Sequence, residues 1–272
     1  MQARVSSIAL VIHPRQLVSR GAVLRRIAVD VWRREGRRVL AIKPVPGEPR
    51  AEAAFVHVDL THIPPAFAET ASRYRISVNA GVTDISKRRI CTTLVSADDS
   101  YEGPAIVKTD LNHLGRSERK IGQRVPDFGW ILAGGAYRTF ERKRAVPARV
   151  WREPGLVVQR LHVERVGTSY FLRQWFFLGD RDLVSIYRGS EPVVKQANVV
   201  ERLPFAYEVP DEMRRRRAEL GFDYGKFDFV IEDGVPVLLD ANATPDNGAR
   251  IDSERSRIIC ETLAPGIDAL GR

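Results

Sequence analysis

The strongest constraint on the fold is one stretch near the C-terminal end, residues 222–248. It reads FDYGKFDFVIEDGVPVLLDANATPDNG, in which two short apolar runs flank the turn Glu232-Asp233-Gly234. An Asp-Gly turn between β-branched and aromatic residues predicts a β-hairpin. The expected strands are residues 226–231 and 236–241.

Three oxygen-bearing side chains lie on this hairpin: Asp228, Asp240 and Asn242. Because side chains alternate along a strand, Asp240 and Asn242 project from one face, and Asp228 can face them across the hairpin. Such oxygens suit Mg²⁺, or Mn²⁺ in its place, carrying substrate phosphates. Carboxylates among Val, Leu and Phe are costly to bury unless they bind a metal or a donor. The alternative is that these residues cap turns.

Composition sets the broad class of the protein. A chain of 272 residues is long enough for two or three small lobes. It has no apolar run near the 18 residues of a membrane span, and SSIALVIH reads better as a strand than as a signal peptide. The two cysteines show no metal-binding spacing and indicate reduced thiols in a cytoplasmic protein.

The net charge of +9 comes mostly from arginine. A basic balance fits a nucleic-acid partner, an anionic substrate or an arginine-rich proteome. The arginine clusters, RRIAVDVWRREGRR and EMRRRRAEL, lie on predicted helices and lack the interleaved aromatic residues of a nucleic-acid platform. The sequence therefore argues against nucleic-acid binding and for solvated helix faces.

The N-terminal region predicts a small parallel sheet. Residues 6–13 and 38–45 read as strands, and residues 21–35 between them form an amphipathic helix that ends at Gly36. A strand, a helix and a strand with a short return form a right-handed βαβ unit. Residues 53–64 add a further strand.

Polar residues on that further strand form a second candidate site. By alternation His57 and Asp59 share a face, and His62 follows. They could form a metal triad or the polar lining of a substrate cleft, and the pattern favours the cleft.

Two cations stand in apolar strands. Lys108 ends GPAIVKTD, and a loop with Asn112 and Gly115 follows, which fits a phosphate site made by a point charge and backbone N–H groups. A strand-end lysine also commonly just extends to solvent. Arg173 is flanked by apolar residues, and a half-buried guanidinium needs an anion, which a triphosphate or acyl phosphate would supply.

The order Asp228, Asp240, Asn242 and then Thr244-Pro245 resembles the closing motif of the ATP-grasp superfamily, in particular RimK-type and glutathione-synthetase-like carboxylate–amine ligases. In that motif an acid and an acid-x-Asn pair hold Mg²⁺ against the nucleotide. The chain departs from the motif in having Asp240 where Glu is more frequent and Asp246 where Gly is usual.

The resemblance assigns further residues to the nucleotide site. Lys87 and Lys108 match two lysines that hold the α- and β-phosphates. Backbone groups of a hinge strand bind adenine, an acid binds the ribose, and a basic residue and an asparagine face the phosphates. The residues at these positions are Gln159, Arg160 and Leu161 for the hinge, Glu164 for the ribose, and Lys195 and Asn198 for the phosphates.

Arg173 matches the arginine that steadies the transferring phosphoryl group in such ligases, although Phe171 stands where they have an acid. The paired glycines of the segment around Lys195 are absent. The family's glycine-rich lid is reduced to Gly115 followed by basic residues.

The resemblance implies an α/β fold with α+β lobes: an ATP-grasp fold preceded by a small parallel α/β lobe. The expected divisions are residues 1–82 for that first lobe, 83–157 for the small ATP-grasp lobe with the phosphate lysines, and 158–272 for the C-terminal lobe with the hinge and the metal hairpin.

The implied reaction uses ATP and Mg²⁺ to activate a carboxylate as an acyl phosphate, which an amine attacks. Two alternatives stay open: a kinase of a small hydroxyl substrate on the same site, and a nucleotide-binding protein without turnover or an RNA-binding scaffold. Fold alone does not choose among them. The acid and amine, small molecules or peptides, are not encoded in any pattern, and a homodimer is expected by analogy only.

Overall fold

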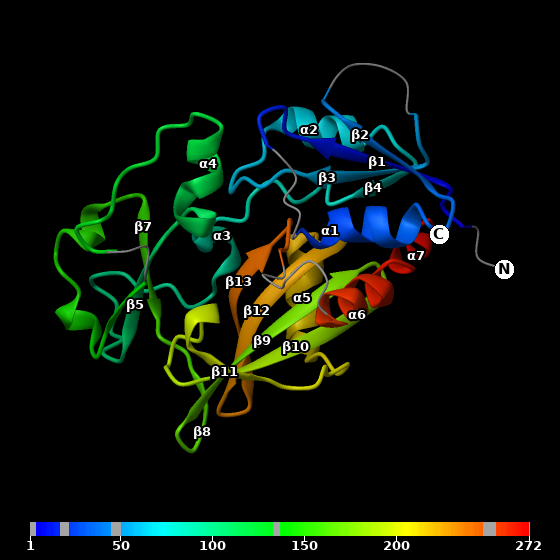
Figure 1. Ribbon diagram of the computed structural model, residues 1–272. Coiled ribbons are helices and arrows are strands. Elements are labelled where there is room, and N and C mark those ends of the chain that lie inside the picture. The colour runs from blue at the N-terminus through cyan, green and yellow to red at the C-terminus, as the bar shows by residue number, and fades with distance from the viewer. Residues whose placement is uncertain (1–3, 17–21, 45–49, 133–136, 247–253, 272) are drawn as a thin grey trace.

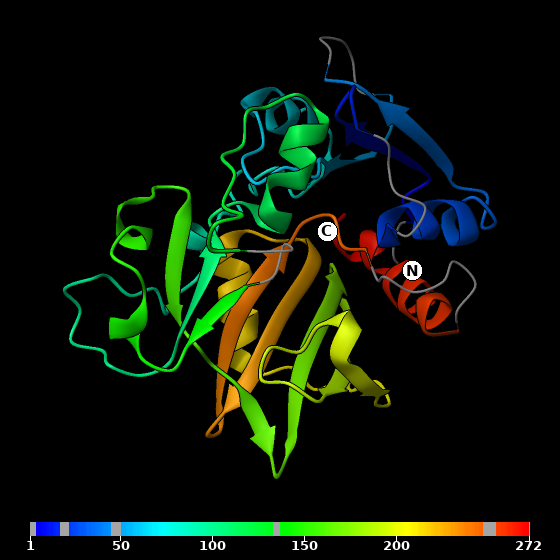
Figure 2. The same ribbon diagram turned by 60° about the vertical axis from the view of Figure 1, so that its left-hand side comes forward.

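Three β-sheets organise the chain; in Figure 1 one of the two smaller sheets lies above the largest and the other lies to its left, and Figure 2 shows the same sheets after a turn. The computed structural model describes residues 4–16, 22–44, 50–132, 137–246 and 254–271. Within these residues, none of the helices combines the length and the apolar character needed to cross a membrane. Both cysteines are free; Cys91 is half-buried and Cys260 is buried.

The first sheet is the predicted parallel one. Its strands run in the order β2-β1-β3-β4, and every neighbouring pair is parallel. The strands are β1 (Ser7–Ile12), β2 (Arg38–Ile42), β3 (Ala53–His57) and β4 (Ile76–Val78). The central strands β1 and β3 are buried almost throughout, as expected for a sheet covered on both faces.

Alternation sends the side chains of these strands into two cores. Leu10 and Phe55 pack with the helical segment after β1, while Val11 and Val56 pack with α2 (Pro65–Ala71). The segment after β1 begins as α1 (Val23–Arg26) and continues as a π-helical stretch over Ile27–Trp32. The predicted helix is therefore present, but its second half has a wider turn. The helical segment ends at Trp32, and a turn continues it to the predicted stop at Gly36, whose φ of +79° favours glycine.

The predicted strand over residues 53–64 is too long. Pairing with β1 stops at His57, although Leu60 and Ile63 further along are buried. An apolar run shows burial but does not distinguish a strand from a buried loop.

The central sheet is antiparallel, in the order β11-β10-β9-β12-β13, with β8 also paired to β9. Its strands are β8 (Glu164–Val166), β9 (Ser169–Leu178), β10 (Arg181–Gly189), β11 (Val199–Arg202), β12 (Tyr224–Glu232) and β13 (Val235–Asn242). Phe176 and Leu178 face the first sheet and α6 (Glu254–Leu263). Trp175 and Phe177 face α5 (Asp211–Leu220).

The third sheet is small, and its strands run in the order β6-β5-β7. These strands are β5 (Ala105–Thr109), β6 (Arg138–Phe140) and β7 (Leu156–Arg160). One-turn helices flank β5: α3 (Lys87–Ile90) before it and α4 (Arg116–Lys120) after it. The divisions at residues 82 and 157 stay predictions; β7 spans the second one and pairs with β5 along its whole length.

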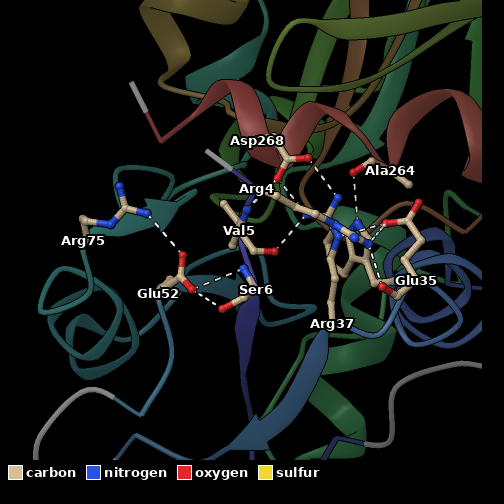
Figure 3. Close-up of polar contacts among 10 residues, drawn as sticks. Arg4, Val5, Ser6, Glu35, Arg37, Glu52, Arg75, Ala264 and Asp268 are labelled. Atoms are coloured by element: carbon tan, nitrogen blue, oxygen red, sulfur yellow. Dashed lines mark hydrogen bonds and ion pairs between the residues drawn. The ribbon is translucent and has the colours of Figure 1, made fainter. Parts of the chain in front are cut away.

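A buried arginine fastens the C-terminal helix to the first sheet, as Figure 3 shows. Arg37 donates from Nη1 and Nη2 to the two carboxylate oxygens of Asp268 on α7 (Gly266–Ala269), at 2.7 and 2.9 Å, and to the Val5 carbonyl at 3.0 Å. Burial alone would raise the pKa of Asp268, but hydrogen bonds from Arg37 and from the Val5 N–H hold it below its ordinary value.

We expect Arg37→Met to lower the free energy of unfolding by about 3–5 kcal/mol, because it leaves Asp268 partly buried without its cation. Urea denaturation measures this change. Arg34→Met, on an exposed position of the same segment, is the matched control and should stay within about 0.5 kcal/mol of the wild type.

The same pair gives a pH test. A carboxylate with a depressed pKa stabilises the folded state at neutral pH, and this contribution is lost as the pH falls through the folded pKa. The difference in stability between wild type and Arg37→Met should therefore narrow below about pH 4. A difference that stays constant down to acid pH contradicts the assignment.

Candidate active site

A cavity of about 450 Å³ is lined jointly by the third sheet and the central sheet. Strands β5 and β7 contribute one side of it, and β9, β12 and β13 contribute the other. Residues 192–196 add a further part of the lining.

The predicted hairpin carries a row of polar side chains into this cavity. Strands β12 and β13 form the predicted hairpin, and a register shift between Asp228 and Phe229 places Asp228 directly opposite Asp240. On its other side Asp228 lies opposite Gln174 of β9. Gln174 also lines the cavity and was missed, although it alternates with the core residue Trp175.

Lys87 brings a positive charge against this row. Ser86 caps α3 by accepting a hydrogen bond from the Arg89 N–H, so Lys87 occupies the first position of the helix. Its Nζ lies 2.7 Å from Oδ1 of Asp240, and its side chain is only 3% exposed. Burial alone would raise the pKa of Asp240, but the attraction and hydrogen bond of Lys87 hold it below its ordinary value.

The facing carboxylate differs in its environment. Burial raises the pKa of Asp228, and Asp240 adds to the rise, while Lys226 at 3.0 Å opposes it. A divalent cation between the two carboxylates would offset the cost of their burial, so the pair fits Mg²⁺. Among the described residues no group of three or more His, Cys, Asp or Glu gathers as a metal site. Two carboxylates are nevertheless sufficient where substrate phosphates complete the coordination.

Two more lysines face the same cavity. Lys108 is buried near the end of β5, and burial lowers its pKa to about 8 despite the opposing charge of Asp240. Its Nζ lies 5.2 Å from the centre of the Tyr137 ring, and Nζ of Lys195 lies 4.4 Å from the same centre. Burial raises the pKa of Tyr137, which keeps the phenol protonated beside the two cations. Tyr137 was not predicted.

Most of the predicted site residues line the cavity: Lys87, Lys108, Gln159, Arg160, Leu161, Lys195, Asp228 and Asp240. The lining does not include Glu164, Arg173, Asn198 and Asn242. The roles predicted for all of these residues stay predictions.

Glu164 and Arg173 bind each other instead. Arg173 donates from Nε and Nη2 to the Glu164 carboxylate at 2.9 and 2.7 Å, and the Ile231 N–H also donates to that carboxylate at 2.9 Å. Alternation along β9 places Arg173 on the opposite face from Gln174. Arg173 was expected to pair with a phosphate, but its anionic partner in the structure is Glu164.

The two asparagines accept hydrogen bonds from backbone groups. Oδ1 of Asn242 accepts from the Thr244 N–H, and Oδ1 of Asn198 accepts from the Lys195 N–H, each at 2.8 Å. For Asn242, such capping of a turn is the alternative to metal binding that the sequence left open.

The three residues of the second candidate site differ in burial and in their partners. His57 is buried, and burial lowers its pKa to about 4. Asp59, beyond the end of β3, accepts hydrogen bonds from Ser117 and Thr244. His62 is 61% exposed and lies beside Asp84.

No protein-family model and no curated protein matches the chain, but solved structures do. The ATP-grasp ligase PsnB, in complex with a phosphomimetic variant of a minimal precursor, Mg and ADP, is 13% identical over 99% of this chain and 100% of that one, with a TM-score of 0.52. PsnB with a precursor peptide and AMPPNP is 14% identical over 96% and 98%, with a TM-score of 0.50.

A RimK domain ATP-grasp protein from Sphaerobacter thermophilus is also similar, at 15% identity over 97% of this chain and 98% of that one, with a TM-score of 0.46. The two PsnB alignments run over nearly the whole length of both chains. The three sheets described above are therefore those of a chain with the ATP-grasp fold.

Proposed function

We propose that the protein is an ATP-dependent carboxylate–amine ligase. The observation that carries the proposal is the cavity itself, in which Asp228 and Asp240 face each other and which Lys87, Lys108 and Lys195 also line. This arrangement suits a polyphosphate with a divalent cation. The fold is shared with a ligase whose solved complexes contain ADP, Mg and a precursor.

The lysines would bind the triphosphate. Lys108 and Lys87 approach from the third sheet and the segment before it, and they would hold the α- and β-phosphates. Lys195 lies over the same Tyr137 ring as Lys108 and would face the transferring γ-phosphoryl group. Asp228 and Asp240 would hold Mg²⁺, which when bound neutralises charge developing on the β- and γ-phosphates.

The reaction would proceed in two displacements. In the first, an oxygen of the substrate carboxylate attacks the γ-phosphorus, and the bond to the ADP oxygen breaks. In the second, the amine attacks the carbonyl carbon, the bond to phosphate breaks, and the amine loses a proton. Lys195 would stabilise the negative charge in both steps as a preorganised cation. We assign Arg173 a positioning role, because its pair with Glu164 braces β8 against β9.

The test of the reaction class uses hydroxylamine as the amine. Incubation with ATP, Mg²⁺ and a panel of small carboxylic acids and of peptides containing Asp and Glu should give an acyl hydroxamate and an equal amount of ADP. This result reports an activated acyl group. A phosphorylated hydroxyl product without hydroxamate would instead establish a kinase, and the ligase proposal would fail.

The metal role of Asp228 has a separate test. We expect Asp228→Asn to weaken the binding of Mg–ADP by at least roughly tenfold, because even the loss of a residue that only hydrogen-bonds to a metal ligand costs that much. Thermal shift should show the Mg²⁺-dependent part of the ADP stabilisation disappearing, while the metal-free part stays. Asp233→Asn, at the exposed turn of the same hairpin with a φ of 50° that Asn tolerates, is the matched control. Equal responses of the two variants contradict the metal site.

Lys108 predicts a pH dependence. Only its protonated form attracts phosphates, and its pKa lies at about 8. Metal-free ADP should therefore bind more weakly as the pH rises from 7 to 9 in the wild type. Lys108→Met should bind ADP weakly throughout, with little pH dependence over this range. Exposed Lys43 on the first lobe provides the control Lys43→Met, which should keep the wild-type profile. Calorimetry at each pH measures the affinities.

A further inference from the structure

The positive charge of the chain is concentrated around the third sheet. Residues 111–152 hold ten Lys and Arg against three Asp and Glu, so they supply +7 of the net charge of +9. All of these cations except Lys143 are exposed. Within the parts of the chain that the structure describes, Arg149 is the only one of the exposed cations with an ion pair, which it forms with Glu153 at 3.5 Å.

Arginines elsewhere are neutralised by the protein itself. On α5, for example, Arg214, Arg215 and Arg216 each pair with an acid. The arginine cluster of α5 therefore attracts few further anions, whereas the region of residues 111–152 keeps its charge for a partner. A concentrated positive charge raises the local concentration of anionic ligands.

A second cavity, of about 300 Å³, opens in this basic region. Its volume is at the lower end of the range for ligand pockets. All of its lining residues lie between Thr109 and Leu132, so none of them belongs to the central sheet. Thr109, Leu114 and Arg116 line the main cavity as well, and the two cavities therefore adjoin.

A left-handed turn leads from β5 to the arginines of this second cavity. His113, Leu114 and Gly115 have φ angles of 45°, 61° and 68°. At Gly115 a side chain would also meet Cγ1 of Val125 at 2.8 Å. Left-handed conformations at residues other than glycine cost energy and cluster at functional sites. The turn sets the direction in which α4 starts, and with it the position of the arginine at the first residue of α4.

Helix α4 is also fastened from behind. Glu118 accepts hydrogen bonds from the N–H and the hydroxyl of Thr61 at 2.8 and 2.7 Å. The Ser117 hydroxyl donates to Asp59. Both partners lie just beyond the end of β3, so the first lobe holds the helix in place. The arginines on the remaining side of α4 are therefore presented from a fixed helix.

Arg116 is an unpaired cation at the junction of the two cavities. It forms no hydrogen bond or ion pair with another described residue. Arg119, three residues on and therefore on the same side of α4, donates to the Leu114 carbonyl at 2.9 Å. Asp127 in the same lining accepts from the Gly129 N–H at 2.9 Å. Two guanidinium groups outweigh one carboxylate, so the lining as a whole attracts an anion.

We propose that the second cavity binds a second carboxylate of the acid substrate, with Arg116 as its direct partner. The first carboxylate would enter the adjoining main cavity to be phosphorylated. A guanidinium binds a carboxylate through two parallel hydrogen bonds. Asp127 disfavours a doubly charged phosphate in the second cavity, because a singly charged group meets less repulsion. The inference rests on the proposed function and narrows its acid to a small polycarboxylic acid or an acidic peptide.

The test compares matched acids in the hydroxylamine assay with the full chain. One set pairs dicarboxylic acids with monocarboxylic acids of the same chain length. The other pairs capped peptides that hold two Glu at varied spacing with the same peptides in which one Glu is replaced by Gln. In the set that reacts, the best acid with two carboxylates should have a kcat/KM roughly tenfold or more above its partner, as expected for a hydrogen bond to a charged group. The set that reacts identifies the source of the second carboxylate.

Arg116→Gln should remove this preference, because the variant lacks the charge that binds the second carboxylate. The measured quantity is the ratio of kcat/KM within a pair, in which a general loss of activity cancels. Arg116 is exposed, so the variant should fold. Arg124→Gln is the matched control, since Arg124 is exposed in the same region and lines neither cavity, and it should keep the wild-type ratio.

A charge reversal gives a second variant. Arg116→Glu should favour an analogue in which an ammonium group replaces the second carboxylate, because the repulsive partner becomes the attractive one. A variant that is merely damaged would not gain activity toward this analogue.

The outcomes separate the two proposals. If no acid gives a hydroxamate, the ligase proposal falls and the carboxylate subsite falls with it. If acids react but the wild type does not prefer two carboxylates, or if Arg116→Gln keeps the preference, only the subsite fails. An equal loss of the preference in Arg124→Gln would assign it to the general charge of the region and would also overturn the subsite.

Discussion

The candidate site depends on the buried ion pair between Lys87 and Asp240. Its 2.7 Å contact joins α3 to the β12–β13 hairpin, which lies far away in sequence. The Lys87 N–H also donates to the Asp110 carbonyl just beyond β5, so the same turn fixes the end of the strand that carries Lys108. Removing two charges from water is expensive, and removing one partner of such a pair costs about 3–5 kcal/mol. The pair therefore sets how the third sheet meets the central sheet.

Several lysines lie close together near this pair, and their positive charges explain why the cavity suits an anion. Lys87 lowers the pKa of Lys108 through its charge, after the larger effect of burial. Lys195 shares the Tyr137 ring with Lys108, and Lys226 lies against Asp228. A bound polyphosphate would reduce the repulsion among these lysines. This reduction would add to the direct attraction between the lysines and the phosphates.

Local patterns predicted the elements that short-range rules govern. The Asp-Gly turn predicted the hairpin, and the strand–helix–strand spacing predicted the parallel sheet. The turn alone would place Asp228 opposite Leu239, and the irregularity between Asp228 and Phe229 that brings Asp240 opposite it was not predicted. Contacts between distant strands were not predictable in this way. The pair of Glu164 and Arg173 forms within the short hairpin of β8 and β9, and it was missed because the resemblance assigned both side chains to the nucleotide. Gln174 enters the site only through its place beside Asp228, and two other strands separate β9 from β12 in the sequence.

Packing on the far face of strand β12 explains how like-charged side chains in the cavity can stay close together while the strand keeps its position. Its cavity face carries Asp228, while Phe227 on the other face meets Trp175, Phe177 and Phe222 edge to face, with ring centres 5.1 to 5.7 Å apart. Such aromatic pairs add about 0.5–1.5 kcal/mol each beyond the area that they bury. The backbone behind the carboxylates is thus held by the core and not by the charges it presents. Strand β12 therefore keeps its position when the charge at Asp228 changes, which preorganised electrostatic catalysis requires.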